Sequence, residues 1–163
     1  MLLLPTLNDQ TLRLLPNAAG AYILHIVVKA DVALVQRQFA GKVIKHGTYF
    51  YCGSARGPGG LAARVKRHCA SDKKPHWHID ALTIMPVGKV MSVLAVPDGN
   101  ECDLCCWLRE KFLLAVPVPG FGSSDCAVCP AHLLAVPGGA LMAVGGALMA
   151  VNILNSIKNT ASV

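Results

Sequence analysis

The stretch YFYCGSARGPGGLAARVKRHCASDKKPHWHID, from Tyr49 to Asp80, indicates how the rest of the chain is organised. It opens with a short aromatic run of strand character and then breaks at Gly57-Pro58-Gly59-Gly60, a run that neither a helix nor a strand tolerates in its interior. The next segment, Leu61 to His68, has a composition that favours a helix. The stretch therefore predicts a strand, a glycine-rich turn, a basic helix and then a polar cluster.

Two side chains of the expected helix, Arg64 and His68, are four residues apart and leave the same face. A cation beside an imidazole, just after a glycine loop, is suited to handling phosphate groups. Each residue taken alone is equally typical of a solvated helix surface. The pair becomes a candidate site only when further residues join it.

Charge is distributed unevenly along the 163 residues. Residues 1–80 carry eleven Lys and Arg against four Asp and Glu, whereas residues 81–163 carry four against five. A basic half with aromatic residues among its charges is typical of a surface that binds a polyanion, most often nucleic acid, although a solvated basic face gives the same pattern. The candidate DNA-binding side chains are Lys66, Arg67, Lys73, Lys74, His76 and His78.

The order of elements predicts an α+β domain with a small, mainly antiparallel, three-stranded sheet flanked by helices. The expected strands cover residues 20–28, 49–52 and 89–96, and the expected helices cover 61–69 and 101–114, before a loop over 117–131. We expect residues 1–15 to be a lead-in, 16–134 to form the domain and 135–163 to be a low-complexity apolar tail. Nothing in the sequence indicates an oligomeric state.

The tail contains the segment GGALMAV twice, at 138–144 and 145–151, and no charged residue occurs from Leu133 to Leu154. That length could span a membrane, but Pro137 and four glycines interrupt it, so we expect a packed or loosely ordered helix instead. The apolar start, Met1 to Pro5, lacks the basic residues of a secretory signal. We therefore expect a cytoplasmic protein whose seven cysteines are reduced, which favours metal binding over disulfides.

Two short motifs resemble the paired signature of the GIY-YIG nuclease family. They are Gly20-Ala21-Tyr22 on the first expected strand and Tyr51-Cys52-Gly53 on the second, with Ala21 and Cys52 where the motifs carry isoleucine. The local sequence resembles one branch of the family, which has no assigned substrate. The shared motifs are YxYxGSA at 49–55, RxxRH at 64–68, HWHID at 76–80 and GFGSSDC at 120–126. The resemblance covers residues 16–134.

This resemblance implies a metal-dependent endonuclease that hydrolyses phosphodiester bonds in DNA, with no small-molecule cofactor. Glu101 would hold Mg²⁺ or Mn²⁺, as suits a hard carboxylate, and Arg64 would clamp the phosphate. Tyr22 or Tyr51 would orient or deprotonate the attacking water, and His68 would orient the nucleophile or assist the proton transfer. Each residue also has a purely structural interpretation, such as packing of the tyrosines in a core; it is the ordered set that favours a site.

The segment His76-Trp77-His78 with Asp80 has two equal interpretations. In an extended chain His76 and His78 point the same way, a geometry usable for metal or phosphate. Alternatively the segment is a structural cluster in which Trp77 is buried and Asp80 orients a histidine.

The cysteines offer a second metal site. Cys102-x₂-Cys105 and Cys126-x₂-Cys129, with Cys106 and His132 nearby, have a spacing close to that of zinc ribbons. In the branch that the chain resembles, residues matching Cys102, Cys126 and His132 recur, so these three are the preferred ligands of a structural zinc. The alternative is that the cysteines are ordinary core residues.

Two other classes of function stay open beside the nuclease. One is a catalytically silent nucleic-acid-binding module, which the charge distribution supports equally well. The other is a zinc-stabilised or membrane-attached adaptor, suggested by the cysteines and the tail.

Overall fold

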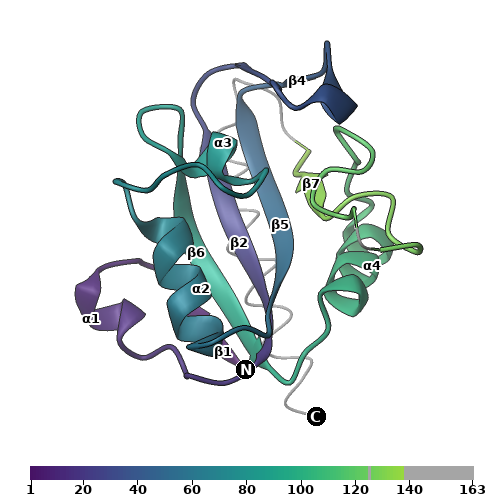
Figure 1. Cartoon of the computed structure of the whole chain (residues 1–163). Helices are drawn as coiled ribbons and strands as arrows, with labels where there is room; N and C mark the ends of the chain where they lie inside the picture. The colour runs from purple at the N-terminus through teal and green to yellow at the C-terminus, as the bar shows by residue number, and fades with distance from the viewer. Residues whose placement is uncertain (125, 138–163) are drawn as a thin grey trace.

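The computed structural model describes residues 1–124 and 126–137 and shows an α+β domain built on a five-stranded antiparallel sheet (Figure 1). In spatial order the strands are β1 (Leu2–Leu4), β6 (Gly88–Pro97), β2 (Gly20–Val28), β5 (Gly47–Ala55) and β7 (Leu133–Ala135). A separate pair, β3 (Val32–Ala33) and β4 (Val43–Ile44), lies in the connection between β2 and β5. The helices are α1 (Asp9–Leu12), α2 (Gly60–Cys69), α3 (Asp80–Thr83) and α4 (Glu101–Phe112), with a 3₁₀ turn η1 at Arg37–Phe39.

The centre of the sheet is β2, which pairs along its whole length with β5 on one side and β6 on the other. Its β-branched and apolar residues suit a strand that is buried on both faces. The register places Gly20 opposite Ala55 and Val28 opposite Gly47, so Tyr22 lies directly opposite Gly53. The antiparallel pairing of the three long strands confirms the sequence expectation.

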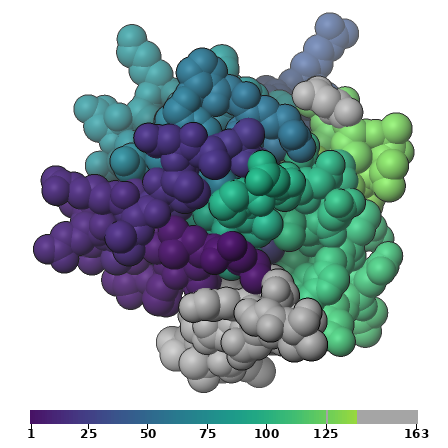
Figure 2. Space-filling view, turned by 90° about the horizontal axis from the view of Figure 1, so that it is seen from below, coloured from purple at the N-terminus to yellow at the C-terminus, as the bar shows by residue number. Residues whose placement is uncertain are grey.

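The prediction of a three-stranded sheet is wrong, because two short strands extend it at its edges. β1 pairs with Val93–Ala95 of β6, and β7 pairs with Tyr49–Tyr51 of β5. From below, Figure 2 shows the N-terminal residues in dark purple beside the green segment near residue 100, where β6 leads into α4. Three residues are too few to show the alternation that identifies a strand, so the sequence did not reveal them.

Helices cover both faces of the sheet. Alternate residues of β2, beginning with Tyr22, Leu24 and Ile26, pack in one cluster with Leu61 and Val65 of α2. Ile23, on the opposite face, packs with Phe50, Cys105 and Leu108 in the cluster beneath α4. Glu101 therefore begins the helix that covers the face opposite α2.

The expected helices at 61–69 and 101–114 are present, although α4 ends at Phe112, where Leu113 adopts a left-handed conformation. Among the residues that the structure describes, no helix is long and apolar enough to cross a membrane. The repeat at 138–151 and the rest of the tail from 138 lie outside the described residues.

Candidate active site and metal centre

One cavity of about 680 Å³ brings together all five residues expected to form the active site. Tyr22 comes from β2, Tyr51 from β5, Arg64 and His68 from α2, and Glu101 from the first turn of α4. Further lining residues that the sequence did not single out include Ser54, Arg56 and Ser123. Residues separated by up to 79 positions thus share one concave site, as a catalytic centre requires.

The closest contact inside this cavity joins Tyr22 and His68. The Tyr22 hydroxyl lies 2.8 Å from Nε2 of His68, and both side chains are buried. On the other side of the ring, Nδ1 of His68 lies 3.8 Å from Oδ1 of Asp80, close enough for an electrostatic interaction but too long for a direct hydrogen bond. A carboxylate there favours the proton on Nδ1, which leaves Nε2 to accept the Tyr22 O–H.

Asp80 is fully buried and held by several donors. Arg67 forms a two-pronged ion pair with it, with nitrogen–oxygen distances of 3.1 and 2.8 Å. The backbone N–H groups of His76 and Trp77 donate to Oδ2 at 2.8 and 2.9 Å. Burial acts to raise the pKa of Asp80, but the His68 ring, Arg67 and these N–H groups hold it well below its usual range. Asp80 is therefore a fixed negative charge behind His68.

Both tyrosines are protonated at neutral pH in this environment. Burial raises the pKa of Tyr22 well above its ordinary value, and it raises that of Tyr51 to about 12. Arg64 lowers the pKa of both residues, but burial outweighs it. Burial likewise lowers the pKa of His68, with Asp80 opposing the shift. A neutral histidine beside a neutral tyrosine is a proton acceptor beside a proton donor.

Glycines make room for both tyrosine rings. A Cβ on Gly53 would come within 2.4 Å of the Tyr22 hydroxyl and 2.5 Å of its Cζ. Gly122, which has a φ of +75°, would bring a Cβ to 2.7 Å from Cε2 of Tyr51. Gly53 of the second motif is thus needed because the side chain of Tyr22, from the first motif, lies across it.

Glu101 is suited to holding a hard cation. Asn100 caps α4 by accepting the N–H groups of Cys102 and Asp103, which fixes the first turn of the helix beside the cavity. Oε2 of Glu101 is buried, and among the described residues it has no hydrogen-bond partner. A buried carboxylate oxygen without a donor is costly unless a cation or water pairs with it. The donor set here, a carboxylate and space for water, fits Mg²⁺ or Mn²⁺.

His76 to Ile79 form a turn rather than an extended segment, and Asp80 begins α3. His78 packs against the rings of Phe39 and Phe121, which stack on each other. His76 stacks edge-on against Trp77, which is 41% exposed and carries the guanidinium of Arg64 at 4.5 Å from its ring centre. All three HWH side chains line the cavity. Asp80 does face a histidine, as one interpretation held, but that histidine is His68 and Trp77 is not buried.

The basic residues around α2 divide into two groups. Arg67 and Lys73 have partners within the chain, since Lys73 donates to the carbonyl oxygens of His68 and Thr83. Lys66 and Lys74 are exposed and do not line the cavity. Arg56 and Arg64 are the arginines that line it. Arg56 follows the YxYxGSA segment directly, a position in the sequence that could have drawn attention to it.

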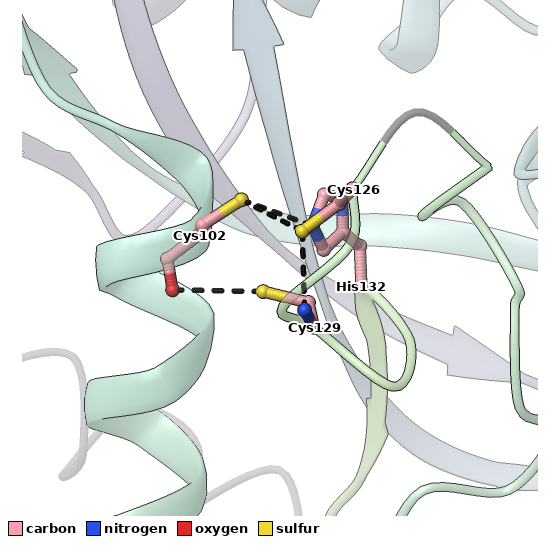
Figure 3. Close-up of side chains that lie close together, drawn as sticks. All are labelled: Cys102, Cys126, Cys129 and His132. Carbon is pink, nitrogen blue, oxygen red and sulfur yellow. Dashed lines mark hydrogen bonds between the residues drawn. The ribbon is translucent and has the colours of Figure 1, made fainter.

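A cluster of cysteine and histidine side chains also lies at the wall of this cavity. The ligand atoms of Cys102, Cys126, Cys129 and His132 all lie within 4.8 Å of one another, as Figure 3 shows. Three of these residues were expected; Cys129 joins them, whereas Cys105 and Cys106 do not. A set of three thiols and one imidazole could hold a metal ion such as zinc. Hydrogen bonds from the backbone N–H of Cys129, from Cys102 and from the N–H of Val128 lower the pKa of Cys126 to about 7.

Comparison with known proteins gives one family. A model of the domain of unknown function DUF123 matches residues 21–145, which include every residue of the candidate active site and of the cysteine cluster. The curated proteins and the solved structures gave no match. The match covers most of the chain, and the protein therefore belongs to the DUF123 family.

Proposed function

We propose that this protein is a metal-dependent endonuclease that hydrolyses phosphodiester bonds in DNA. The observation that carries the proposal is the convergence of Tyr22, Tyr51, Arg64, His68 and Glu101 on one cavity. Tyrosine hydroxyls with an imidazole can accept the proton of the attacking water, and a cation and a metal-binding carboxylate can neutralise charge on the phosphate. These are the groups that phosphodiester hydrolysis needs around the reacting phosphorus. The order of these residues along the chain, which resembles that of the GIY-YIG nucleases, supports the same reaction.

In the proposed reaction Tyr22 and His68 act as a pair. A water molecule attacks phosphorus, its oxygen forms the new P–O bond, and its proton passes to the Tyr22 oxygen as the Tyr22 proton passes to Nε2 of His68. The 2.8 Å contact between these two atoms permits that transfer. The imidazolium that results lies between the Tyr22 oxygen and the Asp80 carboxylate, which stabilises its charge.

The remaining residues act on the phosphate and the leaving oxygen. Arg64 neutralises a non-bridging phosphate oxygen, and its position over Trp77 keeps its guanidinium at the cavity. The P–O bond to the leaving sugar oxygen breaks, and that oxygen takes a proton from solvent. Glu101 would hold Mg²⁺ or Mn²⁺, which when bound supplies positive charge against the phosphate and lowers the pKa of water.

DNA would approach from the side where Arg56, Arg64 and the HWH segment line the cavity. Trp77 offers a partly exposed aromatic surface there, on which an unpaired base could stack. Arg67 and Lys73 are left out of this interface because they bind Asp80 and backbone carbonyl groups.

The test is cleavage of supercoiled, linear, branched and single-stranded DNA with Mg²⁺, with Mn²⁺ and with chelator. We expect cleavage only with metal, and we expect Glu101→Gln to abolish it because the amide cannot replace the charged ligand. Arg64→Ala should lower the rate by on the order of 10²–10³-fold, as for other preorganised charge contacts. Glu110→Gln, an exposed position on the same helix, is the matched control and should cleave normally.

Two results would contradict the proposal. Metal-independent cleavage, or equal cleavage by Glu101→Gln and the control, would remove Glu101 from the mechanism. Binding of every substrate without cleavage of any would favour the catalytically silent nucleic-acid-binding module.

A further inference from the structure

We infer that Cys102, Cys126, Cys129 and His132 bind one zinc ion as a closed structural centre. Cys102 comes from the first turn of α4, Cys126 and Cys129 come from the loop that follows Leu114, and His132 directly precedes β7. The four ligand atoms lie within 4.8 Å of one another and arise from three separate parts of the fold. No chemistry proposed for the nuclease uses them.

The distances within the cluster fit a tetrahedral zinc site. Cys102 Sγ lies 3.3 Å from Cys126 Sγ and 3.6 Å from Nε2 of His132. Zinc bonds of about 2.3 Å to sulfur and about 2.0–2.1 Å to nitrogen at tetrahedral angles place sulfur atoms about 3.8 Å apart and sulfur and nitrogen about 3.6 Å apart. Modest shifts of the sulfur atoms would therefore complete the coordination.

A disulfide explains the cluster less well. The Cys102 and Cys126 sulfur atoms are 3.3 Å apart, well beyond a bond of about 2.05 Å. A disulfide between them would also leave Cys129 and His132 converging on the same point without a common ligand. Figure 3 shows all four side chains directed at one another rather than in two separate pairs.

The backbone around Cys126 is arranged to receive a thiolate ligand. The N–H groups of Val128 and Cys129 donate to its sulfur at 3.4 and 3.1 Å, so the turn 126–129 wraps around that atom. The loop is closed by Gly120 N–H donating to the Pro130 carbonyl at 2.6 Å and by His132 N–H donating to the Phe121 carbonyl at 2.9 Å. These bonds hold Cys126, Cys129 and His132 together before any ion binds.

The donor set distinguishes this centre from the one at Glu101. Three soft thiolates and a borderline imidazole suit zinc, whereas a lone carboxylate with space for water suits Mg²⁺ or Mn²⁺. Four protein ligands leave no open position for a substrate or a reactive water, so the zinc would be structural. By joining α4 to the loop after it, zinc would fix Glu101 and the Gly122 segment beside Tyr51 at the cavity.

The test is the zinc content of the full chain, purified without added metal or chelator, and it does not depend on nuclease activity. We expect about one zinc per chain, and a Co²⁺-substituted sample should show strong thiolate charge-transfer absorption and tetrahedral ligand-field bands. Cys129→Ser should lose zinc and weaken both Co²⁺ signals. Cys106→Ser is the matched control, since Cys106 lies on α4 near Cys102 but outside the cluster. This variant should retain its zinc and both Co²⁺ signals.

The wild-type chain gives an independent readout that does not require Cys129→Ser to fold. Blocking its thiols with a mercurial should release one zinc per chain, with Cys126 and Cys129 protected from slower alkylating reagents until the metal leaves. A zinc-free chain whose melting temperature is unchanged by chelator, or equal zinc loss in Cys129→Ser and Cys106→Ser, would overturn the inference.

Discussion

The Tyr22 hydroxyl and Nε2 of His68 lie 2.8 Å apart in the interior of the domain, one residue on the central strand and the other on the helix above it. Neither group is charged at neutral pH, because burial raises the pKa of the tyrosine and lowers that of the histidine. A neutral pair of this kind can take a proton from water in one concerted step. The proposed mechanism depends on that property.

Tyr22→Phe tests the pair most directly. The ring still fills its place against Gly53, so the fold should persist, while loss of the hydroxyl should lower the cleavage rate by about 10²–10⁴-fold. The rate is measured on the best DNA substrate at saturating metal. Tyr49→Phe is the control, because the Tyr49 hydroxyl donates to the Lys45 carbonyl and does not line the cavity. A fully active Tyr22→Phe protein would leave the tyrosine with a packing role only.

Asp80→Asn should affect both stability and catalysis. The substitution removes the charge that Arg67 and His68 face, and breaking such a buried pair costs about 3–5 kcal/mol at pH 7. Because the folded-state pKa of Asp80 is depressed, its stabilisation is present at neutral pH and is lost as the pH falls below the usual carboxyl range. Urea unfolding at pH 7 measures the loss of stability in Asp80→Asn.

A control separates the role of Asp80 from a general loss of charge. Asp72→Asn removes an exposed carboxylate from the loop between α2 and α3 and should change the free energy of unfolding by less than about 0.5 kcal/mol. In the cleavage assay Asp80→Asn should move the acid limb of the pH–rate profile, because the proton on His68 is no longer stabilised. An unchanged profile with a lower rate throughout would mean that Asp80 supports only the fold.

The long elements were predictable from sequence because their patterns are long. The β-branched run at 20–28 and the helix-favouring run at 61–69 each contain enough residues to show their period, and both are present. The edge strands β1 and β7 are set by pairing with β6 and β5, which is a tertiary effect that three residues cannot encode. The same limit applies to α3, whose four residues are too few to show a helical period.

The site was predictable to a similar extent. The five residues of the expected active site do share a cavity, but the sequence did not pair Asp80 with His68, because twelve residues and a turn separate them. Cys129 was passed over for a related reason. The spacing of the cysteines allowed several ligand sets, and only the loop geometry selects Cys129 rather than Cys105.

Stability should fall between pH 6.5 and pH 4 because of His25. Its side chain is buried beside Ser92, and burial lowers its pKa to about 4. In the unfolded chain the histidine takes up a proton below about pH 6.5, whereas the folded protein does not until pH 4, so acid favours unfolding over this interval. The expected loss is about 3 kcal/mol and levels off below pH 4.

Comparison with a His25→Gln variant isolates this contribution from other titrating groups. Free energies of unfolding are measured in urea at pH 7.5, 6 and 4.5 for both proteins. Glutamine can still bond Ser92 but does not titrate, so the variant should lose less stability on acidification. Parallel curves for the two proteins would mean that His25 is protonated in the folded state as readily as in the unfolded one.

Gly53→Ala should damage the site through Tyr22. The new methyl group would overlap the buried Tyr22 ring, and relieving the overlap costs about 1–3 kcal/mol and displaces the hydroxyl from His68. The melting temperature and the cleavage rate should both fall. Gly57→Ala, where a Cβ meets nothing within 4 Å, is the control and should melt as the wild type does. Normal cleavage by a destabilised Gly53→Ala protein would mean that the position of the Tyr22 hydroxyl is not critical.

DNA binding should depend on the arginines of the cavity more than on the lysines of the neighbouring surface. The Glu101→Gln protein allows binding to be measured without cleavage, by fluorescence anisotropy at several salt concentrations. Each phosphate contact contributes a slope of about −0.9 to the logarithm of affinity against the logarithm of salt for duplex DNA. Arg56→Ala should reduce that slope by about one, because Arg56 lines the cavity. Lys66→Ala, which removes an exposed charge outside the cavity, should leave the slope nearly unchanged.

Equal slopes for Arg56→Ala and Lys66→Ala would place the DNA on the general basic surface. A flat salt response in the Glu101→Gln protein would remove the argument for phosphate contacts altogether.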